Sequence, residues 1–179
     1  ELIGPLAQVA LDDDRECRRV ALHLLRRYQH EPIYRGALGE LRKCASDIAR
    51  PLPIRRRAIS ALTQLRDEES AALFVDLLAD SDRGIGTASR VGLRVLTAHD
   101  FGFSREPWLR WLSDRGHEIR IQWLIEGLGD GRANIRLLAS RELWRLTRLL
   151  QPLSETATRT EFSTAQRHYQ RWWAKNHEV

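Results

Sequence analysis

The chain has 179 residues, of which 42% are hydrophobic and 30% are charged. This length suits one ordinary domain or one short solenoid, and the composition is typical of a folded, helix-rich protein rather than a disordered or membrane-embedded one. No apolar run approaches the roughly 20 residues needed to cross a bilayer. The chain contains no Met. We interpret this as the mark of a trimmed or processed piece, so that cytoplasmic and periplasmic locations both stay open.

The net charge of +5 and the pI of about 9.8 suit an anionic partner, whether nucleic acid, lipid or an acidic protein. The basic residues are almost all Arg, with Lys43 and Lys175 the only lysines. A GC-rich genome produces the same bias at neutral positions. Composition alone therefore leaves open whether the basic charge has a function.

Helical hairpins are predicted along most of the chain. The apolar residues recur at spacings of three and four, as on one buried face of a helix. Asp12-Asp13-Asp14 and Asp80-Ser81-Asp82 separate helices because Asp is a good N-cap, and Pro51 stops a helix because the residue before proline leaves helical geometry. The expected pairs of helices span residues 5–11 with 16–28, 33–49 with 54–65, 71–79 with 84–96, and 118–128 with 133–149.

The second helices of these pairs share one pattern of side chains. Three of them contain Arg-x-x-Ala-x-x-x-Leu, and the third pair has Gly86 and Ser89 in place of Arg and Ala. The small residue is expected where a neighbouring helix approaches closely, and the Leu is expected in the core. The three full copies are Arg18-x-x-Ala21-x-x-x-Leu25, Arg55-x-x-Ala58-x-x-x-Leu62 and Arg136-x-x-Ala139-x-x-x-Leu143.

On these residues the chain resembles HEAT repeats, the helical hairpins of the armadillo-like class. The resemblance implies an all-α, right-handed α-solenoid of stacked antiparallel hairpins, and a single domain over residues 1–179. It is nearly silent about function, because members serve as scaffolds, inhibitors, carriers and occasionally enzymes. The approximate repeats are 3–30, 33–67, 69–99 and 117–149.

Two Trp-bearing closures follow the third and fourth repeats, over residues 100–116 and 150–176. Each runs from a Leu-Thr helix end through a loop to a short helix with an aromatic-x-Arg-Trp element. This sequence pattern is similar to one found at the ends of repeats in bacterial HEAT-repeat scaffolds. Trp108 and Trp111 share a helical face and are expected to pack inward, whereas the adjacent Trp172 and Trp173 cannot both do so. Trp172 and Trp173 are therefore the candidate aromatic contacts.

No catalytic, metal or cofactor site is predicted. The chain lacks a Gly-rich phosphate loop, a Gly-x-Ser-x-Gly elbow and a His-Glu-x-x-His motif. His99 and His117 lack partners at metal-ligand spacing. Cys17 occupies the position of a buried Ile in the other repeats, so we expect it to be buried, and a disulfide with Cys44 stays open.

The arginines divide into two groups. The aligned Arg18, Arg55 and Arg136 resemble the ladder arginines of HEAT stacks, which implies pairing with turn aspartates such as Asp14, Asp82 and Asp130. A second group is expected, by helical phase, to line the concave face and to form its binding surface. These residues are Arg19, Arg26, Arg56, Arg90, Arg94, Arg141, Arg145 and Arg148.

The leading hypothesis is a non-enzymatic protein-binding scaffold with an Arg-lined concave surface for an acidic or polar protein. The alternative is nucleic-acid binding through the same surface, where phosphate contacts make affinity depend steeply on salt. By family analogy this includes a HEAT-like DNA glycosylase, for which Trp144 and Glu142 are the loose counterparts. Phycobilin-lyase-type repeats share the hairpin signature as well.

Overall fold

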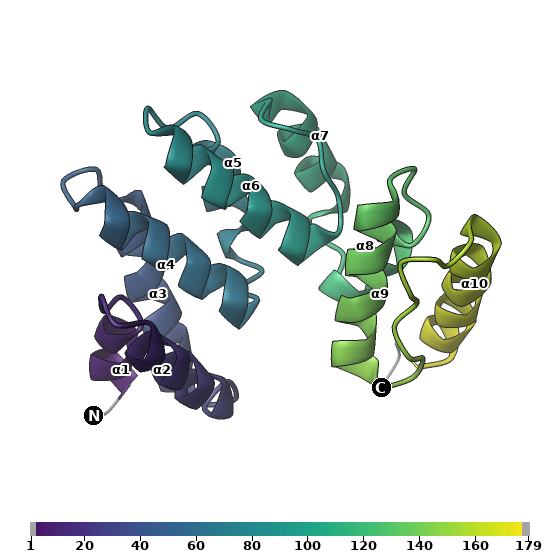
Figure 1. Ribbon diagram of the computed structural model, residues 1–179, viewed down its shortest axis with the longest axis horizontal. Coiled ribbons are helices and arrows are strands. Elements are labelled where there is room, and N and C mark those ends of the chain that lie inside the picture. The colour runs from purple at the N-terminus through teal and green to yellow at the C-terminus, as the bar shows by residue number, and fades with distance from the viewer. Residues whose placement is uncertain (1–2, 177–179) are drawn as a thin grey trace. The chain divides into compact units, whose positions relative to one another are not determined.

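The computed structural model describes residues 3–176, and this part of the chain is helical without strands. None of its helices is long and apolar enough to span a bilayer. Figure 1 shows the helices in chain order. Their bounds are α1 Ile3–Val9, α2 Arg15–Arg27, α3 Pro32–Ser46, α4 Leu52–Leu65, α5 Ser70–Leu77, α6 Arg83–Thr97, α7 Arg105–Arg115, α8 Arg120–Gly127, α9 Ala133–Thr147 and α10 Arg159–Asn176.

The chain forms two compact units. Unit 1 runs to Leu96 and includes Gly102–Leu109, and unit 2 consists of Thr97–Phe101 and the chain from Arg110 onward. Helix α7 therefore contributes its first residues to unit 1 and its remainder to unit 2.

Unit 1 contains three helical hairpins, α1/α2, α3/α4 and α5/α6. Helix α1 packs on α3 and α3 on α5, while α2 packs on α4, so that first helices contact first helices and second helices contact second helices. This is the stacking that HEAT-like hairpins require. The predicted close-approach positions Ala21, Ala58 and Ser89 are all buried, as are Leu25 and Leu62 in the core.

Unit 2 is built on one hairpin, α8/α9, against which the last helix packs. Helix α10 contacts α8 and contributes Phe162 and Tyr169 to the core around Leu124, Ile135 and Leu143. The helix begins at Arg159, inside the segment predicted as a loop, because the Glu161 carboxylate accepts hydrogen bonds from Thr158 N and Oγ1 (2.7 and 2.8 Å). A reciprocal Thr-x-x-Glu pair of this kind begins a helix.

An aspartate organises the turn inside each of the four predicted repeats. The carboxylate of each accepts a hydrogen bond from the backbone N–H two residues later, which fixes the turn. The pairs are Asp12 with Asp14, Asp47 with Ala49, Asp80 with Asp82 and Asp130 with Arg132. Asp14 and Asp82 then cap α2 and α6, as predicted, by accepting from the backbone of Cys17 and Ile85 (2.8 and 2.9 Å).

Two local predictions were wrong. Helix α3 ends at Ser46 rather than at residue 49, because Asp47 is extended and forms the turn described above. Ile48, which falls within the predicted helix over residues 33–49, is consequently 87% exposed. Cys17 is also exposed, although the equivalent Ile85 and Ile135 are fully buried. Both Cys17 and Cys44 are free thiols.

The aligned arginines stabilise turns in two different ways. Arg55 is buried, donates to Ala45 O (3.0 Å) and pairs with Asp80 of the next hairpin (2.7 Å), as a ladder arginine does. Arg18 donates instead to the carbonyls of Asp12 and Asp13, and Arg136 to those of Asp130 and Gly131. The ladder prediction was therefore wrong in its partners: Asp80 replaces Asp82, and two of the three arginines cap the turn of their own hairpin.

Candidate interaction surface

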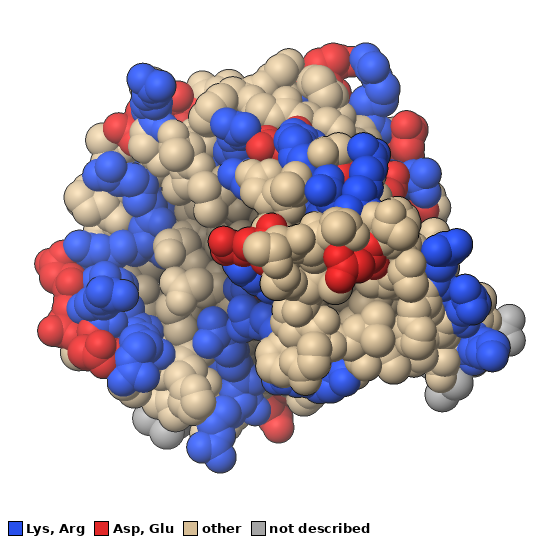
Figure 2. All heavy atoms as spheres, turned by 45° about the vertical axis from the view of Figure 1, so that its right-hand side comes forward, with Lys and Arg blue, Asp and Glu red and all other residues tan. Residues whose placement is uncertain are grey.

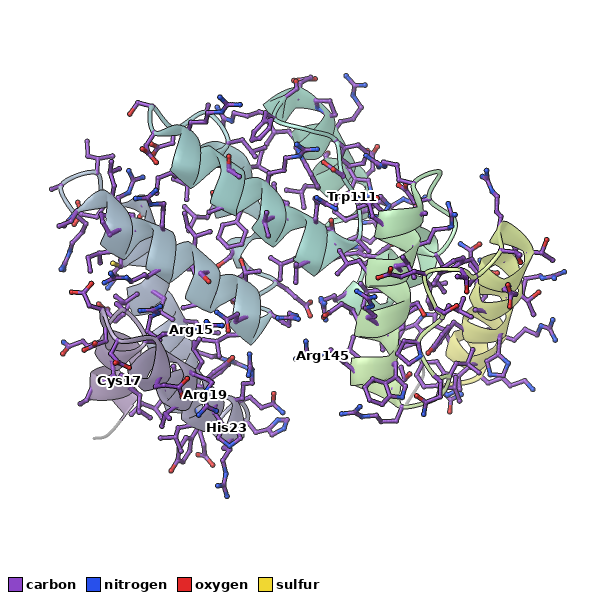
Figure 3. The ribbon with its side chains drawn as sticks, viewed as in Figure 1. Arg15, Cys17, Arg19, His23, Trp111 and Arg145 are labelled. Carbon is purple, nitrogen blue, oxygen red and sulfur yellow. The ribbon has the colours of Figure 1, made fainter. Side chains whose placement is uncertain are left out.

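A row of basic side chains follows one side of α2 in unit 1. Arg15, Arg19 and His23 are spaced four residues apart, and all three are exposed. Figure 3 shows them pointing to the same side of α2, while Cys17 points to another. In Figure 2, Lys and Arg side chains gather on the left of the view, where the N-terminal helices lie. The sequence analysis did not predict Arg15 and His23 as part of this surface, although each lies four residues from Arg19 and therefore on the same side of the helix.

A groove of about 190 Å³ lies between the end of α1, α2 and α4. Its lining includes three guanidinium groups, no carboxylate, and an apolar floor. An arginine groove without acidic residues carries a local positive potential that attracts anionic groups. The residues that line it are Ala10, Arg18, Leu22, Arg56, Arg57, Ser60, Ala61 and Gln64.

Two of the three groove arginines are held in place by neutral backbone atoms. Arg18 Nη1 donates to Asp12 O (2.8 Å) and Asp13 O (2.7 Å), and Arg57 Nη1 donates to Leu11 O (3.0 Å). Arg57 also pairs with the Asp13 carboxylate, which is 92% exposed. Both guanidinium groups are oriented by these bonds; the acceptors of Arg18 are neutral carbonyls, whereas the charge of Arg57 is partly compensated by Asp13.

Arg56 is the third groove arginine, and its side chain is the least engaged in contacts within the protein. It is exposed on α4, and it forms no ion pair or hydrogen bond with the part of the chain that the structure describes. Its guanidinium lies beside the start of α6, where a Cβ added to Gly84 would come within 2.9 Å of Arg56 Nη1. The same Cβ would come within 2.9 Å of Asp82 Oδ1, so the exposed Arg56 lies beside the carboxylate that caps α6 without pairing with it.

The other arginines predicted for this face in unit 1 already have local partners. Arg19 pairs with Glu16 (2.8 Å), Arg26 donates to Gln64 O (3.0 Å), and Arg90 stacks over the Phe103 ring (4.8 Å). Arg94 is half-buried and also interacts within the chain. Among these four only Arg19 has an exposed side chain, so Arg19 and Arg56 are the predicted residues that remain accessible in unit 1.

The predicted arginines of unit 2 are exposed on α9 but are locally paired. Arg141 pairs with Glu155 (3.4 Å), Arg145 with Glu142 (3.5 Å), and Arg148 stacks on the Trp144 ring (4.1 Å). Arg145 points away from α10 in Figure 3. These contacts reduce the basic charge that this helix presents to a partner.

The tryptophans of both closures pack into the protein. Trp108 is fully buried in unit 1, where its indole N–H donates to Gly102 O (3.0 Å). Trp111 is buried in unit 2 against His99 and Trp123, at ring-centroid distances of 4.7 and 5.3 Å. The packing prediction for these two residues is confirmed. Trp172 and Trp173 are both half-buried and pack against the core of unit 2, so each offers only part of its ring to a partner.

The proposed glycosylase counterpart Glu142 is not available for chemistry. Its side chain is 5% exposed and pairs with the equally buried Arg120 (2.7 Å). A carboxylate held in this way is neither open to a nucleic-acid base nor free to accept a proton from an attacking water. This contact weighs against the glycosylase alternative.

The polar residues of the first closure have structural partners. His99 Nδ1 lies 2.8 Å from Thr97 O, and the carbonyl of Asp100 accepts from Arg132. Glu118 pairs with Arg115 (2.8 Å). No group of three or more His, Cys, Asp or Glu side chains is placed to hold a metal ion within residues 3–176.

The structure is that of an α-solenoid repeat protein. It has stacked hairpins with Asp-capped second helices, small residues at the close contacts and a buried ladder arginine. A family model of HEAT repeats matches residues 3–94, more than half of the chain, and the protein belongs to this family. Neither the curated proteins nor the solved structures returned a match. HEAT repeats generally serve as protein-interaction scaffolds and are typically non-catalytic.

Proposed function

We propose that this protein is a non-enzymatic scaffold that binds an acidic segment of a partner protein on the α2–α4 face of unit 1. The observation that carries the proposal is the groove in which Arg18, Arg56 and Arg57 meet without a carboxylate. Arg15 extends the positive charge along the exposed side of α2, where Arg19 is paired with Glu16. The proposed binding surface is therefore one groove and its rim, which is smaller than the predicted surface of eight arginines on several helices.

An extended acidic peptide suits this groove better than a large anionic surface does. The groove is small, its arginines are oriented, and Ser60 and Gln64 add groups that can donate hydrogen bonds to carboxylates or peptide carbonyls. Guanidinium groups bind carboxylates with paired, directional hydrogen bonds. The aliphatic part of a Glu side chain can rest on an apolar floor formed by Leu22, Ala10 and Ala61.

The test is a titration of the protein with a fluorescently labelled decaglutamate peptide and, separately, with a labelled DNA duplex over a series of salt concentrations. We expect saturable peptide binding that the double variant Arg15→Glu/Arg56→Glu weakens at least tenfold. The matched control is Arg159→Glu/Arg171→Glu, which makes the same charge change at two exposed α10 positions whose side chains have no hydrogen bond or ion pair in residues 3–176. The control should bind the peptide within about twofold of the unmodified protein, since distant exposed charges are screened.

Two outcomes would overturn the proposal. Equal losses in both double variants would show that peptide binding follows net charge rather than the groove. Tight DNA binding with a steep salt dependence, lost in Arg15→Glu/Arg56→Glu, would assign the surface to nucleic acid instead.

A further inference from the structure

A second pocket lies in unit 2, between the C-terminal helix, α9 and the connecting loop. Its volume is about 400 Å³, which falls in the range of small-molecule sites. Leu150, Leu153 and Ala165 give it an apolar wall. All of its lining residues belong to unit 2, so the pocket is a property of that unit alone.

Tyr169 lines this pocket and has an unused hydrogen-bonding group. Its side chain is 2% exposed, and its hydroxyl, which is buried, has no hydrogen-bond partner in the part of the chain that the structure describes. The hydroxyl of a buried tyrosine usually finds a partner, because an unpaired one loses its bonds to water without compensation. The free energy lost in this way is recovered if the side chain shifts so that a ligand in the pocket supplies the missing acceptor.

Ser140 provides a second hydroxyl on the same wall. It is 5% exposed, and its oxygen accepts from Leu153 N (2.9 Å), which leaves the hydroxyl proton to be donated. Polar side chains such as Gln151, Thr164 and His168 also line the pocket. Its apolar wall and the two buried hydroxyl groups together favour a ligand that is mostly apolar and carries an acceptor atom.

Glu161, which also lines the pocket, selects against an anionic ligand. The backbone and the hydroxyl of Thr158 donate to its carboxylate and lower its pKa, so that the group stays ionised. A ligand carboxylate placed in the same pocket would be repelled by this charge. A neutral acceptor such as a ketone or an amide carbonyl meets no such penalty.

We propose that the unit 2 pocket binds a small, neutral, largely apolar molecule whose carbonyl oxygen accepts a hydrogen bond from Tyr169, assisted by Ser140. This site is separate from the groove of unit 1 and does not depend on the proposed acidic partner.

The probe for the test is prodan, a neutral naphthyl ketone whose fluorescence shifts to the blue and strengthens when it leaves water. We expect saturable binding to the complete chain and about fivefold weaker binding to Tyr169→Phe, the effect of losing one ordinary hydrogen bond. Tyr34→Phe is the matched control, since Tyr34 is also buried but lies in unit 1. It should bind prodan as the unmodified protein does.

A second variant keeps the test independent of the hydroxyl. Thr164 is exposed on α10 and lines the pocket, so Thr164→Trp should fill the entrance and abolish binding without disturbing the core. Circular dichroism checks that each variant is folded, and 2-naphthoate, which carries a carboxylate, should bind more weakly than prodan.

The proposal is overturned if prodan does not bind, which would leave the Tyr169 hydroxyl merely hydrated. It is overturned as well if Thr164→Trp binds prodan unchanged, which would place the probe elsewhere. Equal affinity of Tyr169→Phe and the unmodified protein would remove Tyr169 from the site. Loss of prodan binding together with intact decaglutamate binding would leave the proposed function of unit 1 standing.

Discussion

The two units use the same residue type, arginine, in opposite ways. On the face of unit 1, Arg15 and Arg56 are exposed and form no ion pair or hydrogen bond among the described residues, and the groove between α2 and α4 contains no carboxylate. On α9 of unit 2, Arg141 and Arg145 face a glutamate and Arg148 covers a tryptophan. The number of arginines on a helix is therefore a poor guide to a binding surface. The charge left uncompensated by neighbours is the informative quantity.

Each unit also contains a buried arginine that pairs with a carboxylate. Arg55 in unit 1 pairs with Asp80 across two hairpins, and Arg120 in unit 2 pairs with Glu142 inside one hairpin. A buried pair adds little net stability, but removing one partner leaves an unpaired charge in a low-dielectric environment. Both pairs are therefore structural, in contrast to the exposed arginines of α2 and α4.

The largest effect is expected where a closure helix inserts a tryptophan into unit 1. Trp108→Ala removes a fully buried indole and its hydrogen bond to Gly102 O, and we expect it to lower the free energy of unfolding by about 4 kcal/mol. Urea unfolding followed by circular dichroism measures the change. Trp173→Ala, at a half-buried position in unit 2, should cost less than half as much. Equal costs would show that the second closure is as tightly packed as the first.

Breaking the buried pair of unit 2 should have the next largest effect. Arg120→Leu removes the 2.7 Å ion pair of the buried Glu142 carboxylate, and we expect a loss of about 3 kcal/mol in the same measurement. Arg141→Leu is the control on α9, because its pair with Glu155 is exposed and should contribute less than about 0.5 kcal/mol. A small effect of Arg120→Leu would mean that Glu142 is easily neutralised or hydrated.

The repeated hairpins could be predicted from the sequence because stacking imposes a local pattern. Residues close together in the chain determine the apolar spacing, the Asp-capped turns and the positions of the small residues Ala21 and Ala58. The structure departs from prediction at positions that the apolar pattern does not determine. Cys17 has the same position in its helix as Ile85 but is exposed, and the start of α10 depends on a capping pair that apolar spacing does not reveal.

The candidate surface was only partly predictable for the same reason. Helical phase identified Arg56 and Arg19 as outward-facing, and they are exposed. Phase does not reveal a partner on another element, so it could not separate Arg56 from Arg90, which stacks on Phe103, or from Arg26, which donates to Gln64 O. The positions of Arg18 and Arg57 in the groove follow from backbone carbonyls, which sequence patterns do not display.

Two glycines of unit 1 should respond to alanine with opposite signs. A Cβ at Gly92 would lie 2.5 Å from Phe74 and 2.8 Å from Thr63 Oγ1, so Gly92→Ala should lower stability by about 2 kcal/mol through overpacking. A Cβ at Gly36, exposed within α3, meets nothing within 4 Å, and Gly36→Ala should raise stability by about 0.5 kcal/mol through helix propensity. Thermal unfolding of both variants makes the comparison. A neutral Gly92→Ala would show that Phe74 can move aside at little cost.

The smallest expected effect is on the pH dependence of unit 2. The Arg132 side chain donates to Asp130 at 2.8 and 2.9 Å and lowers the pKa of that carboxyl below its ordinary value of 3.8. A carboxyl with a lowered folded-state pKa contributes stability above the pKa of the unfolded chain, and loses it as the pH falls through the folded-state value. Asp130→Asn keeps the turn geometry but not the charge. It should therefore be less stable than the unmodified protein by up to about 1 kcal/mol at pH 7, with the difference shrinking below about pH 4. Urea unfolding at several pH values measures this difference, and one that stays constant down to pH 2.5 would show that the pair acts through hydrogen-bond geometry rather than charge.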